Sequence, residues 1–198
     1  PAVTWYNDPE RNRAFREGES AKIRFELVPY TRGVGVELGC GPWRAFPHFI
    51  GIDAQRYDSP LGPSLVMDCS NLATFSDEAF DFVYSSHLLE HLVDTAAALR
   101  EWWRVIEVGG HLVLYLPHKD LYPNIGEPGG NPDHKHDFMP EDIVAAMRLN
   151  AADWDLVRNE TRDQDDECSF FQVFRKLAAG AGQLESWRLP KPAKSAAI

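Results

Sequence analysis

Short apolar segments, each ending at or just before a polar or small residue, recur along the first half of the chain. They cover residues 34–38, 49–53, 64–69 and 80–85, and each is followed by turn-forming residues. Apolar runs of this length that end at turn residues are typical of buried strands. The second run ends in an acid, Asp53, and the third has an acid, Asp68, at its second-last position. The repeat of strand, acid and loop predicts a doubly wound sheet whose ligand lies along the carboxyl ends of its strands.

Helical patterns flank these segments. A helix is predicted from about Ser20 to Leu27, and its loosely defined apolar face consists of Ile23, Phe25 and Leu27. A second helix, Pro140 to Leu149, is favoured by proline at its first position and by the two acidic residues that follow. Two further strands are predicted over residues 154–159 and 169–176, separated by an acidic turn.

The length of 198 residues suits one domain with a sizeable core. We expect a single domain over residues 1–180, in which residues 1–32 are a polar, arginine-rich covering segment. The aromatic side chains of Trp5, Tyr6 and Phe15 indicate that this segment packs against the sheet or a ligand. Residues 181–198 have little core-forming content, and they predict a weakly structured tail.

The composition excludes several kinds of partner. A formal net charge of −10 argues against nucleic acid, because proteins that bind phosphate backbones carry clusters of Lys and Arg. The cysteines Cys40, Cys69 and Cys168 are too widely spaced for a disulfide framework or a CxxC metal site, which favours a cytoplasmic location. No apolar run approaches the roughly 20 residues that span a bilayer. A small molecule is therefore the expected ligand.

The first strand runs directly into a loop with two glycines, Gly39 and Gly41. Glycine tolerates a positive φ and lets a ligand approach the backbone, so this loop is a candidate binding site. The dinucleotide-binding fingerprint requires a third glycine where this chain has Arg44, and an acid about 20 residues further on, whereas Asp53 comes sooner. The loop therefore opposes a pyrophosphate ligand.

The acids after the second and third strands are the next candidates. Asp53 has the position from which a carboxylate accepts hydrogen bonds from both hydroxyls of a ribose. Asp68 would meet an adenine amino group, with the backbone amide of Cys69 available to a ring nitrogen. Aspartate is also a common turn-forming residue, and only the preceding glycine loop favours ligand binding over that structural role.

Three motifs resemble the class I S-adenosylmethionine (AdoMet) methyltransferases, and among them the methyltransferase type 11 group. They are VELGCG (residues 36–41), FDFVYSSHLLEH (residues 80–91), and a helix, double glycine and strand over residues 99–117. Their order and spacing along the chain also match that family.

The resemblance implies an α/β fold, a doubly wound, mostly parallel seven-stranded sheet with an antiparallel C-terminal hairpin (Rossmann-like methyltransferase fold). It implies a helix that begins at Leu88, and a turn at Gly109-Gly110 where a helix stops and the fifth strand starts. The implied cofactor is AdoMet, whose methionine ammonium would be held by the backbone carbonyl of Ser85. The residues expected at the cofactor are Glu37, Gly39, Cys40, Gly41, Asp53, Asp68, Cys69 and Ser85.

One competing motif lies inside the second of these runs. Residues 87–91, HLLEH, match the inverted zinc-protease signature HxxEH, which needs two imidazoles on one helical face and a third ligand elsewhere. Because the methyltransferase resemblance already accounts for this run, we expect no structural zinc, and a packed or hydrogen-bonded His91. His87 lies where the transferred methyl group is expected, so it is a candidate base or a lining residue of the pocket.

A long loop from His118 to Phe138, rich in Gly, Pro, Asp and His, follows the fifth strand. Loops of this length in compact domains are often functional. The resemblance places the acceptor at this edge, and the expected acceptor wall comprises His118, Asp120, Tyr122, His134, His136 and Asp137. His118 and His136 are further candidate bases. The run DHKHD (residues 133–137) contains metal-ligand residue types without a fixed geometry, so a polar turn is expected, with Asp137 as a candidate helix cap.

The sequence thus predicts transfer of a methyl group from AdoMet to a small-molecule or glycan acceptor. A sugar hydroxyl is favoured, because the short first crossover and the loop HKHDF (residues 134–138) resemble methyltransferase-like proteins of bacterial surface-polysaccharide gene sets. Two alternatives stay open: a nicotinamide-dependent oxidoreductase or epimerase, and a catalytically silent AdoMet-binding partner of another subunit. The missing third glycine opposes the first, whereas a silent binder would keep every cofactor residue.

Overall fold

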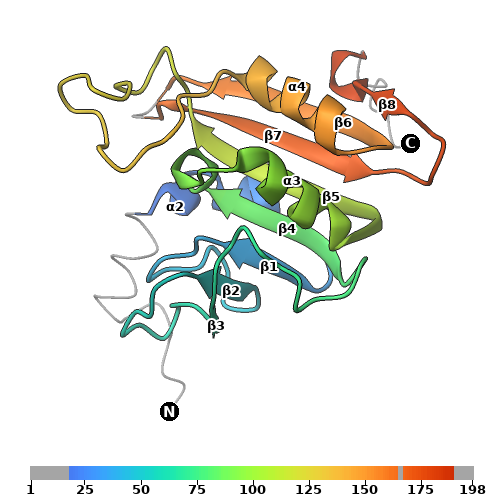
Figure 1. Ribbon diagram of the computed structural model, residues 1–198, viewed down its shortest axis with the longest axis horizontal. Helices are drawn as coiled ribbons and strands as arrows, with labels where there is room; N and C mark the ends of the chain where they lie inside the picture. Colours follow the sequence, from blue (N-terminus) through green and yellow to red (C-terminus); the bar gives the residue numbers. More distant parts are fainter. Residues whose placement is uncertain (1–17, 165–166, 190–198) are drawn as a thin grey trace, which may run out of the picture.

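The fold is known from a computed structural model that describes residues 18–164 and 167–189. Its strands form one sheet in the order β3-β2-β1-β4-β5-β7-β6-β8 (Figure 1). They are β1 (Gly35–Leu38), β2 (Ile50–Asp53), β3 (Leu65–Val66), β4 (Phe80–Ser86), β5 (Ile106–Pro117), β6 (Trp154–Arg162), β7 (Ser169–Lys176) and β8 (Gln183–Leu184). The expected contacts of Trp5, Tyr6 and Phe15 lie outside the described residues.

The pairing of the strands confirms the predicted sheet. Strands β1 to β5 pair in parallel, whereas β7 runs antiparallel to both β5 and β6. Strand β1 is buried along its whole length, and β4, between β1 and β5, is buried on both faces. Burial on both faces explains why these strands are mostly apolar in the sequence, without a regular alternation of apolar and polar residues.

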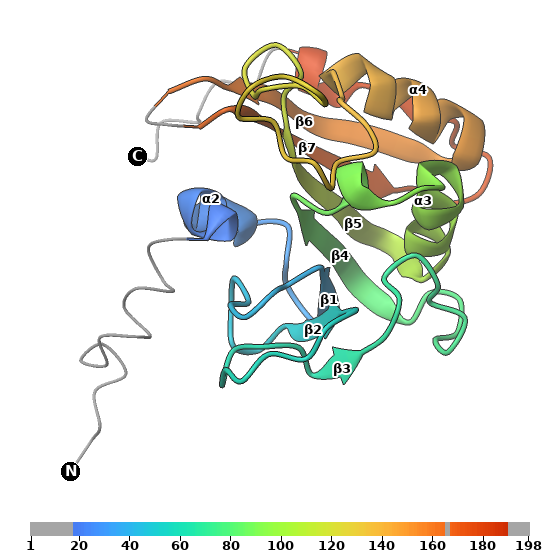
Figure 2. The ribbon, with the colours of Figure 1, turned by 60° about the vertical axis from the view of Figure 1, so that its left-hand side comes forward.

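Three α-helices cover the described sheet. Figure 2 shows α3 (Thr95–Arg104) and α4 (Pro140–Asn150) on one face and α2 (Glu19–Leu27) on the other. Loops alone connect β1, β2, β3 and β4 within the described chain. No helix of this part of the chain is long and apolar enough to cross a bilayer.

Two hydrophobic cores hold the layers together, one on each face of the sheet. The larger core packs α3 and α4 against the sheet, and the indole of Trp102 donates a hydrogen bond of 2.7 Å to the carbonyl of Cys69. The smaller core lies under α2 and contains Phe49, Phe82 and Tyr84. The apolar face of α2 differs from the predicted one, because Phe25 is 75% exposed while Arg24 is buried beside Ile23 and Leu27.

The double glycine lies inside β5, and the prediction of a helix-to-strand turn at Gly109-Gly110 was wrong. Helix α3 ends at Arg104, and β5 starts at Ile106. Ile106 pairs with Phe80 while His111 pairs with Phe82, so the residues between them bulge out of the ladder. Gly109 has a φ of 93°, which suits glycine at a bulge.

Two other local predictions also need correction. No α-helix begins at Leu88, which instead precedes a three-residue 3₁₀ helix, η2 (Leu89–His91). Asp137 does not cap α4, because Met139 is the N-cap and donates its amide to the side chain of Asp142. The Asp137 carboxylate accepts from the amide of Ile125 inside the long loop instead.

Residues 181–189, which lie in the predicted tail, contain a short strand and a 3₁₀ turn. Strand β8 pairs in parallel with β6 and adds an eighth strand to the sheet. A 3₁₀ helix, η3 (Ser186–Arg188), follows, and Ser186 hydrogen-bonds to the buried Asp155 through its amide and its hydroxyl. Asp155 is on β6, so a contact distant in sequence orders this segment.

Candidate cofactor and acceptor site

The carboxyl ends of β1 and β4 point toward the side of the molecule that carries the loop 118–138 (Figure 1). The glycine loop after β1 lies at this edge, and Gly39 and Gly41 have φ values of 67° and 55°. A side chain on Gly39 would come within 2.9 Å of Leu88. Glycine is therefore required here for the backbone conformation and for the close packing of the segment after β4.

Asp53 lies at the end of β2, directly beside this loop. Its Oδ2 accepts a hydrogen bond of 2.9 Å from the amide of Gly41, and its Oδ1 accepts one of 2.9 Å from the amide of Gln55. A carboxylate can accept about four hydrogen bonds, so two amide partners leave capacity for a pair of hydroxyl donors. The carboxylate is partly exposed, as a ligand-binding acid must be.

Glu37 occupies a different environment from Asp53. It is 1% exposed under α2, where its Oε2 accepts a hydrogen bond of 2.7 Å from the amide of Ala45. Burial raises the pKa of its carboxyl to about 8, although Arg44 and Arg24 act in the opposite direction. Through its hydrogen bond to the amide of Ala45, Glu37 therefore fixes the backbone that follows the glycine loop.

The two cysteines near this edge pack behind the loop. Cys40 and Cys69 are 7% and 4% exposed, and the Cys69 thiol donates to the carbonyl of Ile52. Burial raises the pKa of the Cys69 thiol to about 12 and raises that of Cys40 as well. Both thiols are thus neutral and unsuited to nucleophilic chemistry.

Asp68 and Ser85 complete the residues expected at the cofactor. Asp68 is exposed after β3, and its Oδ1 accepts hydrogen bonds of 2.8 Å from both the amide and the hydroxyl of Ser70. Ser85 is fully buried near the end of β4, and its hydroxyl has no hydrogen-bond partner. The residues expected at the cofactor thus lie at or near the ends of neighbouring strands. Among them, Asp68 lies in a turn and Ser85 lies inside the sheet.

His87 is the best placed of the three candidate bases, at the end of β4. Its φ of 49° turns the chain sharply, and its Nε2 lies 3.0 Å from the hydroxyl of Ser169 on β7. Burial lowers the pKa of its imidazole to about 3. A neutral, hydrogen-bonded ring with so low a pKa is a weak base at neutral pH, which favours a lining role.

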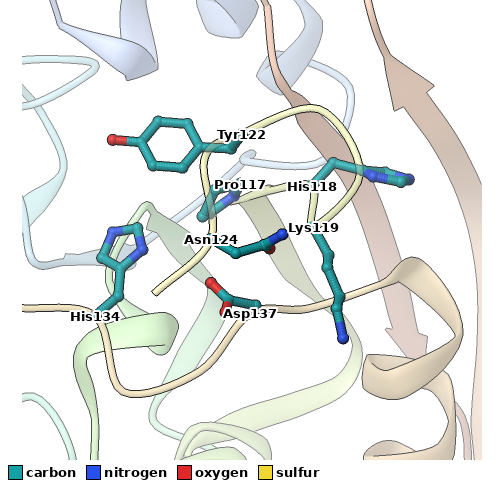
Figure 3. A pocket seen from close by; sticks show the side chains of 7 residues that line it. All are labelled: Pro117, His118, Lys119, Tyr122, Asn124, His134 and Asp137. Atoms are coloured by element: carbon teal, nitrogen blue, oxygen red, sulfur yellow. The ribbon is translucent and has the colours of Figure 1, made fainter. Parts of the chain in front are cut away.

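The other two candidate bases have partners within the loop 118–138 and its surroundings. His118 is 6% exposed, accepts a hydrogen bond from the amide of Asp120 at Nδ1, and contacts the ring of Phe170. Its side chain points away from that of His134 (Figure 3). His136 donates from Nε2 to the carbonyl of Leu92 at 2.9 Å. No ring contact joins His87, His118 and His136 in the described structure.

The loop 118–138 forms a wall at the end of β5. Its two ends are joined by a bridge between His118 and Phe138. Figure 3 shows the side chains that line a small hollow here: Pro117, His118, Lys119, Tyr122, Asn124, His134 and Asp137. The ring of Tyr122 stacks on that of His134, with centroids 5.5 Å apart. Polar and aromatic groups therefore line this hollow, which is too small to hold a water molecule.

A group of three residues, Glu90, His91 and His134, was not predicted as a site. We call it the Glu90 cluster. Its carboxylate and imidazole ligand atoms lie within 4.8 Å of one another, and Glu90 is fully buried. Burial raises the pKa of Glu90 to about 8. In the sequence, the HLLEH motif (residues 87–91) already places Glu90 and His91 side by side. It does not show that His134, from the loop 118–138, joins them.

Comparison with known proteins confirms the resemblance found in the sequence. Residues 36–114 match a family model described as a methyltransferase domain. A demethylmenaquinone methyltransferase from Roseiflexus castenholzii is 35% identical over 86 residues, which is 43% of this chain and 32% of that protein. The chain thus spans about a third of the length of this curated relative.

Solved structures with the same fold cover most of the chain. An AdoMet-dependent methyltransferase from Mesorhizobium loti has a TM-score of 0.62 at 18% identity, covering 81% of this chain and 99% of its own. A chain from the complex between the Haloferax volcanii Trm112 methyltransferase activator and a methyltransferase has a TM-score of 0.63 at 15% identity, covering 88% and 96%. At these identities the likeness concerns the fold, which is that of the Rossmann-like methyltransferases.

Proposed function

We propose, from the match of residues 36–114 to the methyltransferase domain family, that this protein transfers a methyl group from AdoMet to a hydroxyl group of a small polar acceptor. The observation that carries the proposal is the contact between the glycine loop and Asp53. The amide of Gly41 lies 2.9 Å from Oδ2 of Asp53, at the carboxyl edge of two adjacent parallel strands. Ligands of doubly wound sheets bind at this edge.

A dinucleotide is a poor alternative ligand for this edge. Its pyrophosphate would be bound by the N-terminus of a helix that follows the glycine loop. In the described structure a loop without a helix joins β1 to β2. The side chain of Arg44 lies there, donating to the carbonyl of Phe49 at 2.7 Å and to the hydroxyl of Ser64 at 2.9 Å. This arrangement supports AdoMet over a nicotinamide cofactor.

Catalysis in this proposal consists mostly of positioning. Bound AdoMet would supply a methyl group already activated on a sulfonium. The chain must hold the acceptor oxygen in line with it at near-contact distance and exclude water. His87 lines this region from the end of β4, and the loop 118–138 borders it from β5. A base is needed only to take the hydroxyl proton.

The acceptor class follows from the chemistry of the wall. Tyr122, His134 and Asp137 place hydroxyl, imidazole and carboxylate groups on the loop 118–138, where an acceptor would bind against its surface (Figure 3). Such groups suit hydrogen bonds to a sugar or glycoside better than contacts with an apolar ring system. A net charge of −10 opposes a polyanionic acceptor.

Calorimetric titration with S-adenosylhomocysteine and, separately, with NAD tests the cofactor. We expect binding of the first and none of the second, and the reverse result would contradict the proposal. Turnover of AdoMet against a panel of sugars and glycosides then tests the activity. Binding of S-adenosylhomocysteine without turnover of any acceptor would support the silent partner subunit instead.

A further inference from the structure

The Glu90 cluster lies where η2 meets the loop 118–138. Glu90 and His91 belong to η2, and His134 comes from the loop more than 40 residues further along the chain. Oε1 of Glu90 is 3.9 Å from Nε2 of His91 and 3.9 Å from Nε2 of His134. The two imidazoles meet edge to face, with centroids 4.7 Å apart. Two rings and a carboxylate thus converge from separate parts of the chain.

The carboxylate of Glu90 lacks the partners that a buried polar group normally has. Its side chain is fully buried, and neither of its oxygens has a hydrogen-bond partner in the described structure. An unsatisfied buried polar group costs about 1–3 kcal/mol, and more when it is charged. The Glu90 carboxyl is therefore stable in this position only if it carries a proton or if a cation lies between it and the imidazoles of His91 and His134.

The backbone around Glu90 fixes the loop against η2. The carbonyl of Glu90 accepts hydrogen bonds from the amides of Lys135, at 2.7 Å, and His136, at 3.2 Å. These amides directly follow His134, whose ring is also stacked on Tyr122. The fold therefore holds His134 against Glu90 independently of any contact between their side chains.

We propose that Glu90, His91 and His134 bind a divalent first-row transition-metal ion such as Zn²⁺. Two imidazole nitrogens and one carboxylate oxygen are a donor set that zinc sites use, and three protein ligands leave coordination positions open. Bonds of about 2.0–2.1 Å place tetrahedral ligands about 3.3 Å apart. From 3.9 Å, the Glu90 oxygen and each imidazole need to approach by about 0.6 Å. The two imidazoles, whose ligand atoms lie within 4.8 Å of each other, need to approach by at most about 1.5 Å. Small rotations of the side chains achieve this.

This site differs from the zinc-protease signature that the same residues spell. The protease signature requires both histidines of the motif as ligands, on one face of a helix, with the glutamate as a base. Here η2 is only three residues long, and Nε2 of His87 is hydrogen-bonded to Ser169. The glutamate itself is a ligand, and His134 replaces His87. The proposal therefore replaces the sequence-based expectation of a site without metal.

The ion would lie close to the region where the methyl group is transferred. Leu88, two residues before Glu90, borders Gly39 of the cofactor loop, and Nδ1 of His87 is 3.8 Å from Oε1 of Glu90. An open coordination position can take an acceptor oxygen and lower its pKa. This use of the ion rests on the proposed function, whereas the metal site does not.

The metal site is tested with the full chain after treatment with a chelator, in the absence of AdoMet and acceptor. Zn²⁺ binding is measured by calorimetry, and Co²⁺ binding by its visible absorption, which reports the ligand geometry. We expect one ion per chain. Absence of binding by both ions would overturn the proposal, and it would leave the S-adenosylhomocysteine titration, which tests the proposed function, unaffected.

Variants assign the ligands. Glu90→Gln and His91→Asn should each weaken binding by at least about 10- to 100-fold, which is the loss caused by changing a residue that only hydrogen-bonds to a metal ligand. His48→Asn is the matched control, because His48 is exposed after the glycine loop and should leave binding unchanged. Wild-type affinity in both Glu90→Gln and His91→Asn would assign the ion to other residues and overturn the proposal. If Glu90→Gln does not fold, as judged by circular dichroism, His91→Asn, with a side chain 31% exposed, decides.

Discussion

Asp53 is the residue on which cofactor binding should depend most directly. Asp53→Ala removes an acceptor of charge-assisted hydrogen bonds and frees the amide of Gly41. We expect S-adenosylhomocysteine affinity to fall by about 1–3 kcal/mol, roughly 5- to 150-fold. Calorimetry measures the change, with Asp58→Ala, an exposed acid in the following loop, as the control. Equal affinities in the two variants would remove Asp53 from the ribose site.

Among the elements, the loop 118–138 is the one whose role needs a test. From the sequence His136 is one of three candidate bases, but in the structure its Nε2 donates to the carbonyl of Leu92. His136→Ala removes this hydrogen bond and should leave the loop 118–138 less well fixed. We therefore expect lower turnover, mainly through a higher KM for the acceptor. Affinity for S-adenosylhomocysteine should stay nearly unchanged, because the strand ends supply that site.

His136→Gln separates the two roles. A glutamine amide can still donate to the carbonyl of Leu92, but it cannot accept a proton as a base. We expect this variant to retain most of the wild-type kcat. A loss of about 100-fold or more in kcat, equal in both variants, would instead identify the imidazole of His136 as a base. Steady-state kinetics over the pH range 5.5 to 8.5 (about three units) gives the comparison.

The stability of the whole molecule should depend on pH through Glu37. Its folded pKa is about 8, raised by burial, against an ordinary value of 4.5. Between these values the folded chain holds a proton that the unfolded chain has lost, so stability falls as pH rises. Below about pH 6.5 the low pKa of His87 acts in the opposite direction, because its imidazole is protonated only on unfolding.

The clear window is therefore from about pH 6.5 to 8, where Glu37 contributes a slope of up to about 1.4 kcal/mol per pH unit. Urea unfolding of the cofactor-free protein at both ends of this window measures the slope. Glu37→Gln should remove about half of the total slope, because the amide does not titrate while Glu90, whose pKa burial also raises to about 8, still does. A slope that the substitution leaves unchanged would show that Glu37 is already ionised in the folded protein.

The sequence by itself determined the parallel half of the sheet. Strands β1, β2 and β4 are apolar runs because both of their faces are buried, and the residues that follow them must turn at one common edge. Local chemistry therefore sufficed to predict Gly39, Gly41 and Asp53 at that edge. The hairpin of β6 and β7 followed from the family resemblance.

Only the tertiary structure decided features that depend on residues far apart in the chain. Gly109 and Gly110 lie in a bulge because of how β5 pairs with β4, and β8 forms because β6 offers it a free edge. His134 meets Glu90 because amides of the loop bind the carbonyl of η2. A sequence pattern reports the spacing of neighbours along the chain, whereas these contacts depend on which backbone groups the fold leaves available for pairing.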